Sequence, residues 1–583
     1  MSNSSRGNII DISLLKRVLK YTIPYKNYFF IALFTAIILS LLGPIRPVLI
    51  NFTVDNYILI PDPEGLLRII IIIFSLLVIE GIVQFFYIYL SSWIGQHVIQ
   101  DLRSKIFEHI ISLKMRYFDK TPIGKLVTRT ISDVETISDI FSQGLLVIIA
   151  ELLKLVIIIF LMFYTNWQLT FVTLLTIPIL IFSTIWFKRN IKKSFQDVRD
   201  QVANLNTFVQ EHLSGMNIVQ IFNQEDREFL KFKTINMNHR DAHLRSIFYY
   251  AVFFPIVEIL SATSIALIVW YGGHAILSGK EMTEGELIAF ILFVYMMFRP
   301  IRQLADRFNI LQMGIVGAER IFKVLDYNDK IEVKENILTD FEGDIEFHDV
   351  YFGYNTKMLV LKKINLSIKS NKMLALVGST GSGKTSIINI LMRFYDYSKG
   401  EIKIGGTSIR KFNLKYLRSN IGLIQQEVFL FSDTIFNNIT LHDRKIKKED
   451  VVIAAKKIGV HNFINSLPNK YDYIVGERGV TLSSGQRQLI AFLRVYLRNP
   501  KIIILDEATS SVDSKTELMI KNALEKVSHK RTTIVIAHRL STITNADKIL
   551  YLEQGKILEE GTHEQLLKKK SYYHTLFNKQ KET

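Results

Sequence analysis

The first half of the chain carries long apolar runs, whereas the second half carries short apolar runs between polar residues. A helix needs about 20 mostly apolar residues to cross a bilayer. Six segments follow this pattern, and the last, which is short, is predicted to continue past Pro300. They are 28–50, 67–90, 144–164, 169–187, 248–271 and 286–298. The pattern predicts a membrane domain of six helices.

Lysine and arginine are unequally distributed among the segments that join these runs. Segment 51–66 carries acidic residues but neither Lys nor Arg, and 165–168 is uncharged. Segments 93–141 and 188–245, by contrast, are rich in Lys and Arg. Because basic residues favour the cytoplasmic side, we expect both segments and both termini to face the cytoplasm. The chain is therefore predicted to be a multi-pass protein of the cytoplasmic (inner) membrane.

Both basic segments are too long for turns, and they keep a helical pattern over most of their length. We expect membrane helices that extend far into the cytoplasm, with a short crossing piece at each tip. Gly124 and Gly215 interrupt the pattern and place the tips near 118–125 and 215–222.

The N-terminal segment 9–26 alternates apolar and basic side chains and does not resemble a secretory signal. The pattern predicts an amphipathic helix in the membrane interface. A helix packed on the protein surface would have the same pattern, so both interpretations stay open.

Several ionisable residues fall inside the predicted spans, where they are costly and mark functional candidates. Glu151 and Lys154 are spaced so that they can pair on one helix. Glu80 and Glu258 have no obvious partner on their own helices, and Arg46 can snorkel or line a cavity. Structural pairing and substrate contact both remain open for these residues.

Hydropathy falls near Arg320, and from Gly343 short strands alternate with helices, as in a soluble α/β domain. The predicted organisation has four parts. They are an N-terminal tail with the interfacial helix (1–27), a six-helix membrane domain (28–312), a linker (313–342) and an α/β domain (343–583).

The stretch MLALVGSTGSGKTSIINIL, 373–391, predicts a strand, a glycine-rich turn and a helix with the spacing GxxxxGK[ST] of a phosphate-binding loop. Its glycines let the backbone approach an anion, and the helix start directs N–H groups at phosphate. Lys384 is expected to reach the β- and γ-phosphates, and Thr385 to bind Mg²⁺. The residues expected to hold ATP are Gly378, Ser379, Thr380, Gly381, Ser382, Gly383, Lys384, Thr385 and Ser386.

Three further positions have chemistry that suits a nucleotide. Tyr354 ends an alternating run, and its ring can stack on a purine. Gln426 follows an apolar strand and can contact Mg²⁺ or orient a water. The pentapeptide LSSGQ, 482–486, opens a helical pattern whose first N–H groups form an anion site. Taken alone, each is equally well explained as a strand tyrosine, a loop glutamine or a capping turn.

Two apolar strands end in ionisable residues. KIIIL runs into Asp506 and Glu507, of which one is expected on Mg²⁺ and Glu507 is expected to act on the attacking water. His538 ends the strand TTIVIAH, where it can hydrogen-bond a γ-phosphate. Adjacent acids and histidines at strand ends also occur for purely structural reasons.

Composition narrows the alternatives further. The 583 residues include no cysteine, which excludes disulfides, thiolate metal sites and cysteine nucleophiles. The net charge of +17 follows largely from the basic inward segments, so nucleic acid is not needed to explain it.

Taken in order, these features closely resemble the ATP-binding cassette (ABC) family over essentially the whole chain from the first span. GERG at 476–479 and FDKTPIGKLVTR in the first inward segment look like those of exporter half-transporters. The matching positions are Tyr354 (adenine-stacking aromatic), 378–385 (first Walker motif), Gln426 (Q-loop), 482–486 (signature), Asp506 and Glu507 (second Walker motif), 510–513 (D-loop) and His538 (switch histidine).

The resemblance implies a membrane all-α domain of six helices with long cytoplasmic extensions, fused to a P-loop α/β nucleotide-binding domain. It implies an ATPase that moves a hydrophobic or amphipathic substrate (a drug, lipid or peptide) by alternating access. An ATP-gated channel or sensor, and an importer on the exporter fold, are the alternatives. Glu507 favours turnover over gating, because a gate needs only binding.

The resemblance also implies a dimer that holds two ATP molecules, in contact with membrane lipids. Each ATP lies between one chain's phosphate loop and the other chain's signature, so Ser483, Ser484, Gly485 and Gln486 would serve the partner's nucleotide. Mg²⁺ would be held by Thr385, Gln426 and Asp506. Catalysis would fall to Glu507, His538 and Gln426.

One residue departs from the family pattern. The signature is usually LSGGQ, and Ser484 stands here in place of its first glycine. A side chain at that point weakens the approach of backbone to the γ-phosphate. In heterodimeric exporters, one chain typically keeps the catalytic glutamate while its own signature is altered. The resemblance thus favours a heterodimer with a second half-transporter, and a homodimer that tolerates serine is the alternative.

Overall fold

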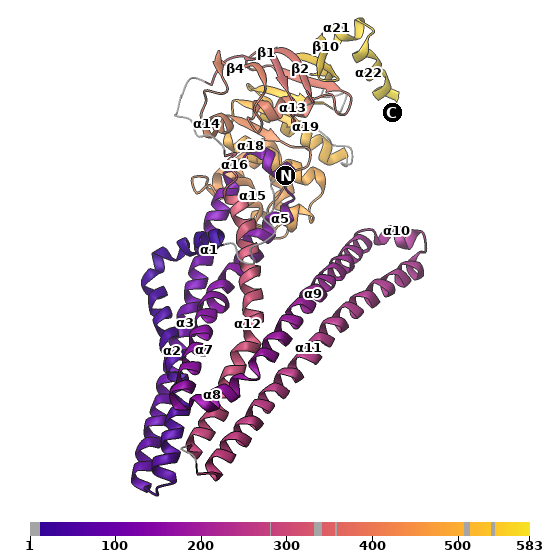
Figure 1. The fold of residues 1–583 in the computed structure, drawn as a ribbon. Coiled ribbons are helices and arrows are strands. Elements are labelled where there is room, and N and C mark those ends of the chain that lie inside the picture. Colours follow the sequence, from indigo (N-terminus) through magenta and orange to yellow (C-terminus); the bar gives the residue numbers. More distant parts are fainter. Residues whose placement is uncertain are drawn as a thin grey trace. The chain divides into compact units, whose positions relative to one another are not determined.

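The computed structural model describes residues 12–279, 282–330, 341–355, 358–506, 514–537 and 543–582. The chain forms two compact units, Met1–Ile111 with Ile123–Tyr327, and Ser112–Pro122 with Asn328–Thr583. The first unit is helical and the second combines helices with two sheets (Figure 1). This architecture confirms the predicted fold class of a helical membrane region fused to an α/β domain.

Long helices make up the first unit (Figure 1). Within the part of the chain that the structure describes, five helical stretches are long and apolar enough to cross a membrane, namely Ile12–Ile58, Pro63–Ile111, Ile123–Thr165, Trp167–Ser214 and Glu225–Leu277. The sixth predicted span lies in a helix of 42 residues, α12, which continues through Pro300 as expected. The helices are α1 Ile12–Leu19, α2 Lys26–Thr53, α3 Pro63–Ile111, α5 Ile123–Thr128, α6 Val134–Asp139, α7 Leu145–Thr165, α8 Trp167–Leu174, α9 Ile177–Ser214, α10 Met216–Ile221, α11 Glu225–Leu277 and α12 Glu284–Leu325.

The second basic segment forms a long hairpin of helices, as predicted. Figure 1 shows α9 and α11 side by side, joined by the short helix α10 at the predicted tip. The rings of Phe187 and Phe253 stack with centroids 4.2 Å apart. The hydroxyls of Ser194 and Ser246 lie 2.8 Å apart across the same pair of helices. Aromatic stacking and a small polar contact therefore join the two helices in the part of the hairpin that is far from the tip.

An ion pair joins the first two membrane helices. Arg46 of α2 donates a hydrogen bond from Nη2 to Oε2 of Glu80 on α3, at 2.7 Å. Glu80, which has no partner on its own helix, is thus neutralised by a neighbouring helix, and pairing is the usual way to keep a charge inside a membrane.

The pairing that the spacing of Glu151 and Lys154 allows is not formed, because neither residue has an ion pair among the described residues. Lys154 instead extends toward α2, where its Cε lies 3.7 Å from the place that a Cβ on Gly43 would occupy. Packing between helices thus prevails over the local spacing of the two charges.

The N-terminal helix α1 packs on the end of α12. Arg17 makes two hydrogen bonds to the Asp326 carboxylate, at 2.5 and 2.7 Å, and its guanidinium lies 4.0 Å from the centre of the Phe322 ring. This ion pair lowers the pKa of Asp326. Val18 is fully buried. These contacts favour a helix packed on the protein over one held only by lipid.

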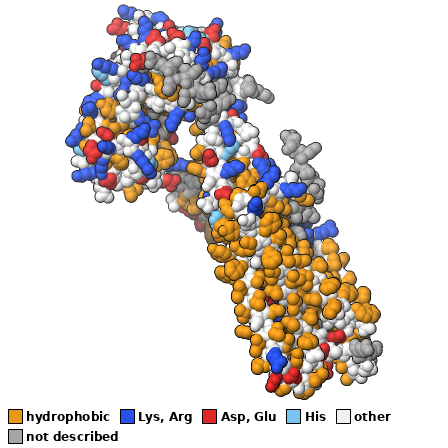
Figure 2. Space-filling view, turned by 90° about the vertical axis from the view of Figure 1, so that its left-hand side faces the viewer, with side chains coloured by type: hydrophobic (Ala, Val, Ile, Leu, Met, Phe, Trp, Pro, Cys, Tyr) orange, Lys and Arg blue, Asp and Glu red, His pale blue; other side chains and the backbone are white. Residues whose placement is uncertain are grey.

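Large hydrophobic side chains cover a broad band of the helical unit (Figure 2). Phe74 and Phe85 of α3 and Phe182 of α9 are 65%, 63% and 73% exposed. Exposed apolar patches of this extent are rare on proteins that face water, and they mark a membrane or partner surface. Together with the helix lengths, this band identifies a multi-pass membrane protein.

Two sheets form the frame of the second unit. One has four strands in the order β2-β1-β4-β5, and the other has six in the order β10-β9-β3-β8-β7-β6. In the larger sheet β9, β3, β8, β7 and β6 run parallel, so their carboxyl ends share one edge. The strands are β1 Ile345–Phe352, β2 Leu361–Ile368, β3 Met373–Gly378, β4 Lys399–Ile404, β5 Thr407–Ser408, β6 Ile421–Ile424, β7 Ile502–Asp506, β8 Thr532–Ile536, β9 Lys548–Glu553 and β10 Lys556–Gly561.

Helices complete this unit. They are α4 Met115–Lys120, α13 Lys384–Leu391, α14 Leu414–Ser419, α15 Ile435–Thr440, α16 Lys448–Ile458, α17 His461–Asn465, α18 Ser484–Arg498, α19 Ser514–Ser528, α21 His563–Lys568 and α22 Tyr572–Glu582. Helix α18 begins at Ser484, inside the predicted signature, and α13 begins at the lysine of the predicted phosphate loop. Both helices thus start where the sequence pattern placed them.

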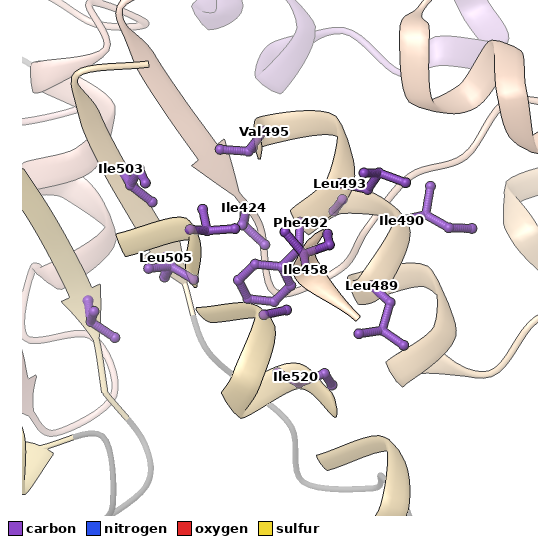
Figure 3. Close-up of a cluster of buried hydrophobic side chains, with 14 of the residues drawn as sticks. Ile424, Ile458, Leu489, Ile490, Phe492, Leu493, Val495, Ile503, Leu505 and Ile520 are labelled. Carbon is purple, nitrogen blue, oxygen red and sulfur yellow. The ribbon is translucent and has the colours of Figure 1, made fainter. Parts of the chain in front are cut away.

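An apolar core fixes α18 and α19 against the larger sheet (Figure 3). Phe492 of α18 lies among Ile424, Leu505 and Ile520, which come from β6, β7 and α19. Each of these side chains is at most 7% exposed. Because this core includes Ile424 at the end of β6 and Leu505 next to the end of β7, it holds the ends of both strands in place.

We predict that Ile503→Ala, which leaves a cavity at a fully buried position of this core, destabilises the second unit by about 2–5 kcal/mol. Leu518→Ala on α19 is the matched control, because Leu518 is 59% exposed. Differential scanning fluorimetry of the full chain should show a fall of roughly 5–15 °C in the unit's unfolding midpoint for the first variant and little change for the second. Equal shifts would contradict the assignment of this core.

Candidate nucleotide-binding site

The turn between β3 and α13 is built from glycines in conformations that other residues avoid. Gly378 has a φ of +146°, and a Cβ there would lie 2.0 Å from the carbonyl oxygen of Leu552 on β9. Gly383 has a φ of +108° and caps the start of α13. The predicted phosphate loop therefore has a backbone that needs glycine at its two ends.

The middle of the loop has open space beside its backbone, which phosphate groups need in order to approach the backbone N–H groups. A Cβ added to Gly381 would meet no atom within 4 Å. Thr380, Gly381 and Thr385 are exposed, whereas Ser382, Lys384 and Ser386 are buried. The exposed backbone and the Thr385 hydroxyl thus form a surface that fits phosphate oxygens and a bound metal.

Lys384 lies folded against its own loop. Its Nζ donates hydrogen bonds to the carbonyl oxygens of Gly378 and Ser379, both at 2.8 Å. The side chain is 7% exposed, and this burial lowers the pKa of Lys384, while the nearby carboxylates of Asp506 and Glu553 oppose the shift. Because the buried ammonium makes its hydrogen bonds to neutral carbonyls, an anion at this loop would stabilise it further.

Strand register brings three predicted positions to one edge of the larger sheet. Leu376 of β3 pairs with Ile536 of β8, and Ile536 pairs with Asp506 of β7. Leu505 in turn pairs with Ile424 of β6, two residues before Gln426. The phosphate loop, Asp506 and Gln426 therefore share the carboxyl edge, which is where ligands bind in open α/β sheets.

Oxygen atoms with the chemistry of a magnesium site are thus present at this edge. Asp506 supplies a carboxylate, Gln426 an exposed amide and Thr385 an exposed hydroxyl. Mg²⁺ prefers such oxygen ligands together with substrate phosphates and water. Glu507, the segment 510–513 and His538 lie outside the described residues.

Tyr354 lies beside the helix that follows the loop. Its hydroxyl is 3.1 Å from Oγ of Ser386 and accepts a hydrogen bond from the Asn389 amide at 3.0 Å. Its ring makes edge contacts with Phe352 and Tyr395, with centroids 4.9 and 5.0 Å apart. The structure thus brings the predicted adenine-stacking ring to the phosphate-binding helix.

The predicted signature is a well-formed helix cap. Ser483 accepts a hydrogen bond from the Gln486 backbone at 3.2 Å, and the Gln486 side chain accepts one from the Ser483 backbone at 2.9 Å. Arg487 donates hydrogen bonds from Nη1 to the carbonyl oxygens of Gly479 and Leu482, at 3.2 and 2.7 Å. This reciprocal box fixes the start of α18.

Within the signature, Ser484 is exposed while Gly485 is buried. Among the described residues, no hydrogen bond or ion pair joins the signature to the phosphate loop of the same chain. Ser484 therefore lies on the exposed surface of this unit.

Sequence reasoning missed two residues that support the loop. Glu553 ends β9 and accepts a hydrogen bond from the Ser379 hydroxyl at 3.1 Å. Asn389 holds the hydroxyl of Tyr354. In the sequence, the position of Glu553 at a strand end was only a weak signal. Glu553 reaches the phosphate loop because β9 lies beside β3. Nothing in the local pattern pointed to Asn389.

Comparison with known proteins agrees with this arrangement. A family model described as the ABC transporter transmembrane region matches residues 29–301, and a second, described as ABC transporter, matches residues 361–510. An uncharacterized ABC transporter ATP-binding protein, YknV of Bacillus subtilis (strain 168), is 36% identical over 97% of this chain and 94% of its own length.

Two further relatives have more specific names. An ATP-dependent lipid A-core flippase of Syntrophus aciditrophicus (strain SB) is 35% identical over 97% of this chain and 94% of its own length. A putative multidrug export ATP-binding/permease protein, YgaD of Bacillus subtilis (strain 168), is 33% identical over 97% of this chain and 99% of its own length.

Lys384→Ala is expected to weaken ATP binding by about 10- to 100-fold, because charge-assisted hydrogen bonds to phosphate are lost. Equilibrium titration of the purified chain with a fluorescent ATP analogue measures the change. The exposed Lys445, replaced by alanine in the same way, is the control and should bind normally. Unchanged affinity in Lys384→Ala would remove this loop from the nucleotide site.

Proposed function

This chain belongs to the ABC transporter family, and we propose that it uses ATP hydrolysis to export a hydrophobic or amphipathic substrate. The main support is that one chain contains both a unit with membrane-spanning helices and a unit with a phosphate-binding loop. Binding energy at the loop can then be converted into movement of the spans. The substrate is a drug, lipid or peptide.

Relatives support export over the alternatives. Among them are a lipid A-core flippase and a putative multidrug exporter. These names favour an exporter over an importer on the same fold. An ATP-gated channel or sensor needs no catalytic carboxylate, whereas this chain keeps Glu507.

We assign the nucleotide chemistry to the residues of the carboxyl edge. Lys384 and the loop backbone bind the phosphates, and Tyr354 stacks on adenine. Thr385, Gln426 and Asp506 hold Mg²⁺, which neutralises charge on the phosphates when bound. Glu507 takes a proton from the attacking water, and His538 contacts the γ-phosphate.

A dimer completes the site, and we propose a heterodimer. The start of α18, where Ser484 is exposed, faces the nucleotide of the partner subunit. The Ser484 side chain takes the place where glycine would let backbone approach the γ-phosphate. The site that includes this chain's Glu507 then needs an intact signature from a second half-transporter.

We place the second unit and both termini in the cytoplasm. The support is the excess of Lys and Arg in 93–141 and 188–245 and their absence from 51–66. The partners are the second subunit, membrane lipids and the transported molecule, with no role for nucleic acid.

Glu507→Gln is expected to keep ATP binding while hydrolysis falls by about 10²- to 10⁴-fold, the usual contribution of a general base. Phosphate release and nucleotide affinity are measured on the same reconstituted protein. The exposed Glu525 on α19 provides a matched Glu→Gln control with normal turnover. Persistence of near-normal hydrolysis in Glu507→Gln would exclude the role given to this carboxylate.

The heterodimer proposal makes a separate prediction. The chain purified alone should hydrolyse ATP slowly, and Ser484→Gly should raise its rate severalfold by removing the side chain from the signature. Co-expression with a half-transporter that carries LSGGQ should raise it further. Fast hydrolysis by the unsubstituted chain alone, with no gain from Ser484→Gly, would instead establish a functional homodimer.

A further inference from the structure

Helix α4 packs within the same unit as the phosphate loop. Leu113 and Tyr117 are buried, at 3% and 8% exposure. Lys114 forms ion pairs with Asp329 at 3.2 Å and with Asp396 at 3.7 Å. The segment Ser112–Pro122, which includes residues 118–122 of the first predicted tip, is therefore anchored on the ATP-binding unit at two points.

Tyr395 lies next to one of these anchors and contacts α4 directly. Its hydroxyl donates a hydrogen bond to the carboxylate of Asp119 near the end of α4. A hydroxyl bound to a carboxylate is a charge-assisted contact, stronger than one between neutral groups. The hydroxyl end of Tyr395 thus follows the position of α4.

The ring end of Tyr395 faces the nucleotide site. It makes an edge-to-face contact with the ring of Tyr354, with centroids 5.0 Å apart and planes at 86°. The hydroxyl of Tyr354 in turn lies 3.1 Å from Ser386, the residue after Thr385 of the phosphate loop. One half-buried aromatic side chain therefore lies between the phosphate-binding helix and α4.

We infer that Tyr395 is a positioning residue through which a purine stacked on Tyr354 affects the position of α4. A base stacked on Tyr354 restricts its ring, and the edge-to-face pair transfers this restriction to Tyr395. The hydroxyl of Tyr395 then fixes or shifts Asp119. This inference rests on the proposed function, since it requires that the loop bind a nucleotide, and it adds a route that senses the base as well as the phosphates.

These two contacts of Tyr395, its ring with Tyr354 and its hydroxyl with Asp119, can be tested separately by substitution. Tyr395→Phe keeps the ring pair with Tyr354 and removes only the bond to Asp119. Asp119→Asn removes the charge that strengthens the same bond. Tyr397→Phe is the matched control, because the Tyr397 hydroxyl makes no hydrogen bond among the described residues.

The absence of cysteine from the chain allows a clean test. Arg116→Cys places one label site on the exposed face of α4. The full chain, reconstituted in lipid nanodiscs and labelled with bimane, is titrated with magnesium AMP-PNP, which binds without hydrolysis. Bimane emission reports the surroundings of α4, and a separate titration reports the nucleotide affinity.

Tyr395→Phe is expected to reduce the nucleotide-dependent change in emission at least about fivefold, while the dissociation constant stays within about twofold. Asp119→Asn should have the same effect, and the double variant should be no worse than either single one, since both remove one contact. Tyr397→Phe should leave the signal unchanged. Magnesium pyrophosphate, which has no base, should bind and give little signal.

The outcomes distinguish failure of the link from failure of the proposed function. If the unsubstituted labelled chain does not bind AMP-PNP, the proposed function fails and the inference fails with it. If it binds but α4 gives no signal, or Tyr395→Phe keeps the signal, or pyrophosphate matches AMP-PNP, only the link is overturned. Loss of signal in step with loss of affinity would make Tyr395 part of nucleotide binding alone, which also overturns it.

Discussion

The sharp turn between β3 and α13 is the constraint on which the rest of the ATP-binding unit depends. β3 lies between β8 and β9 in the larger sheet, so the turn begins from a strand held on both sides. The close approach of Gly378 to the Leu552 carbonyl leaves no room for a side chain. Because the parallel strands end at one edge, this fixed turn lies level with Asp506 and with the residues after β6. The site is therefore a property of the sheet as much as of the loop.

Local spacing was enough to predict the parts of this site that are built from consecutive residues. The phosphate loop and the helix that starts at Lys384 follow from residues a few positions apart. For the same reason, the long helices and the tip at α10 followed from hydropathy and glycine alone. Roles given to Glu507 and His538 remain predictions, since neither residue is described.

Contacts between distant segments could not be predicted. Arg46 and Glu80 lie on different helices, and their pairing depends on how α2 and α3 pack. The spacing of Glu151 and Lys154 suggested a local pair, but Lys154 turns toward Gly43. Glu553 and Tyr395 acquire a role only because β9 lies beside β3 and because α4 packs on the loop after α13. Each depends on tertiary packing that no periodicity encodes.

The proposed function is export of a hydrophobic molecule through the spans, driven by ATP hydrolysis. It is tested most directly in inside-out vesicles that contain the reconstituted transporter, with a set of fluorescent hydrophobic dyes and short-chain lipids. If hydrolysis drives export, at least one probe should accumulate inside against its gradient with magnesium ATP, and not with magnesium AMP-PNP. Equal probe movement with both nucleotides, only down the gradient, would contradict active export and identify an ATP-gated pathway.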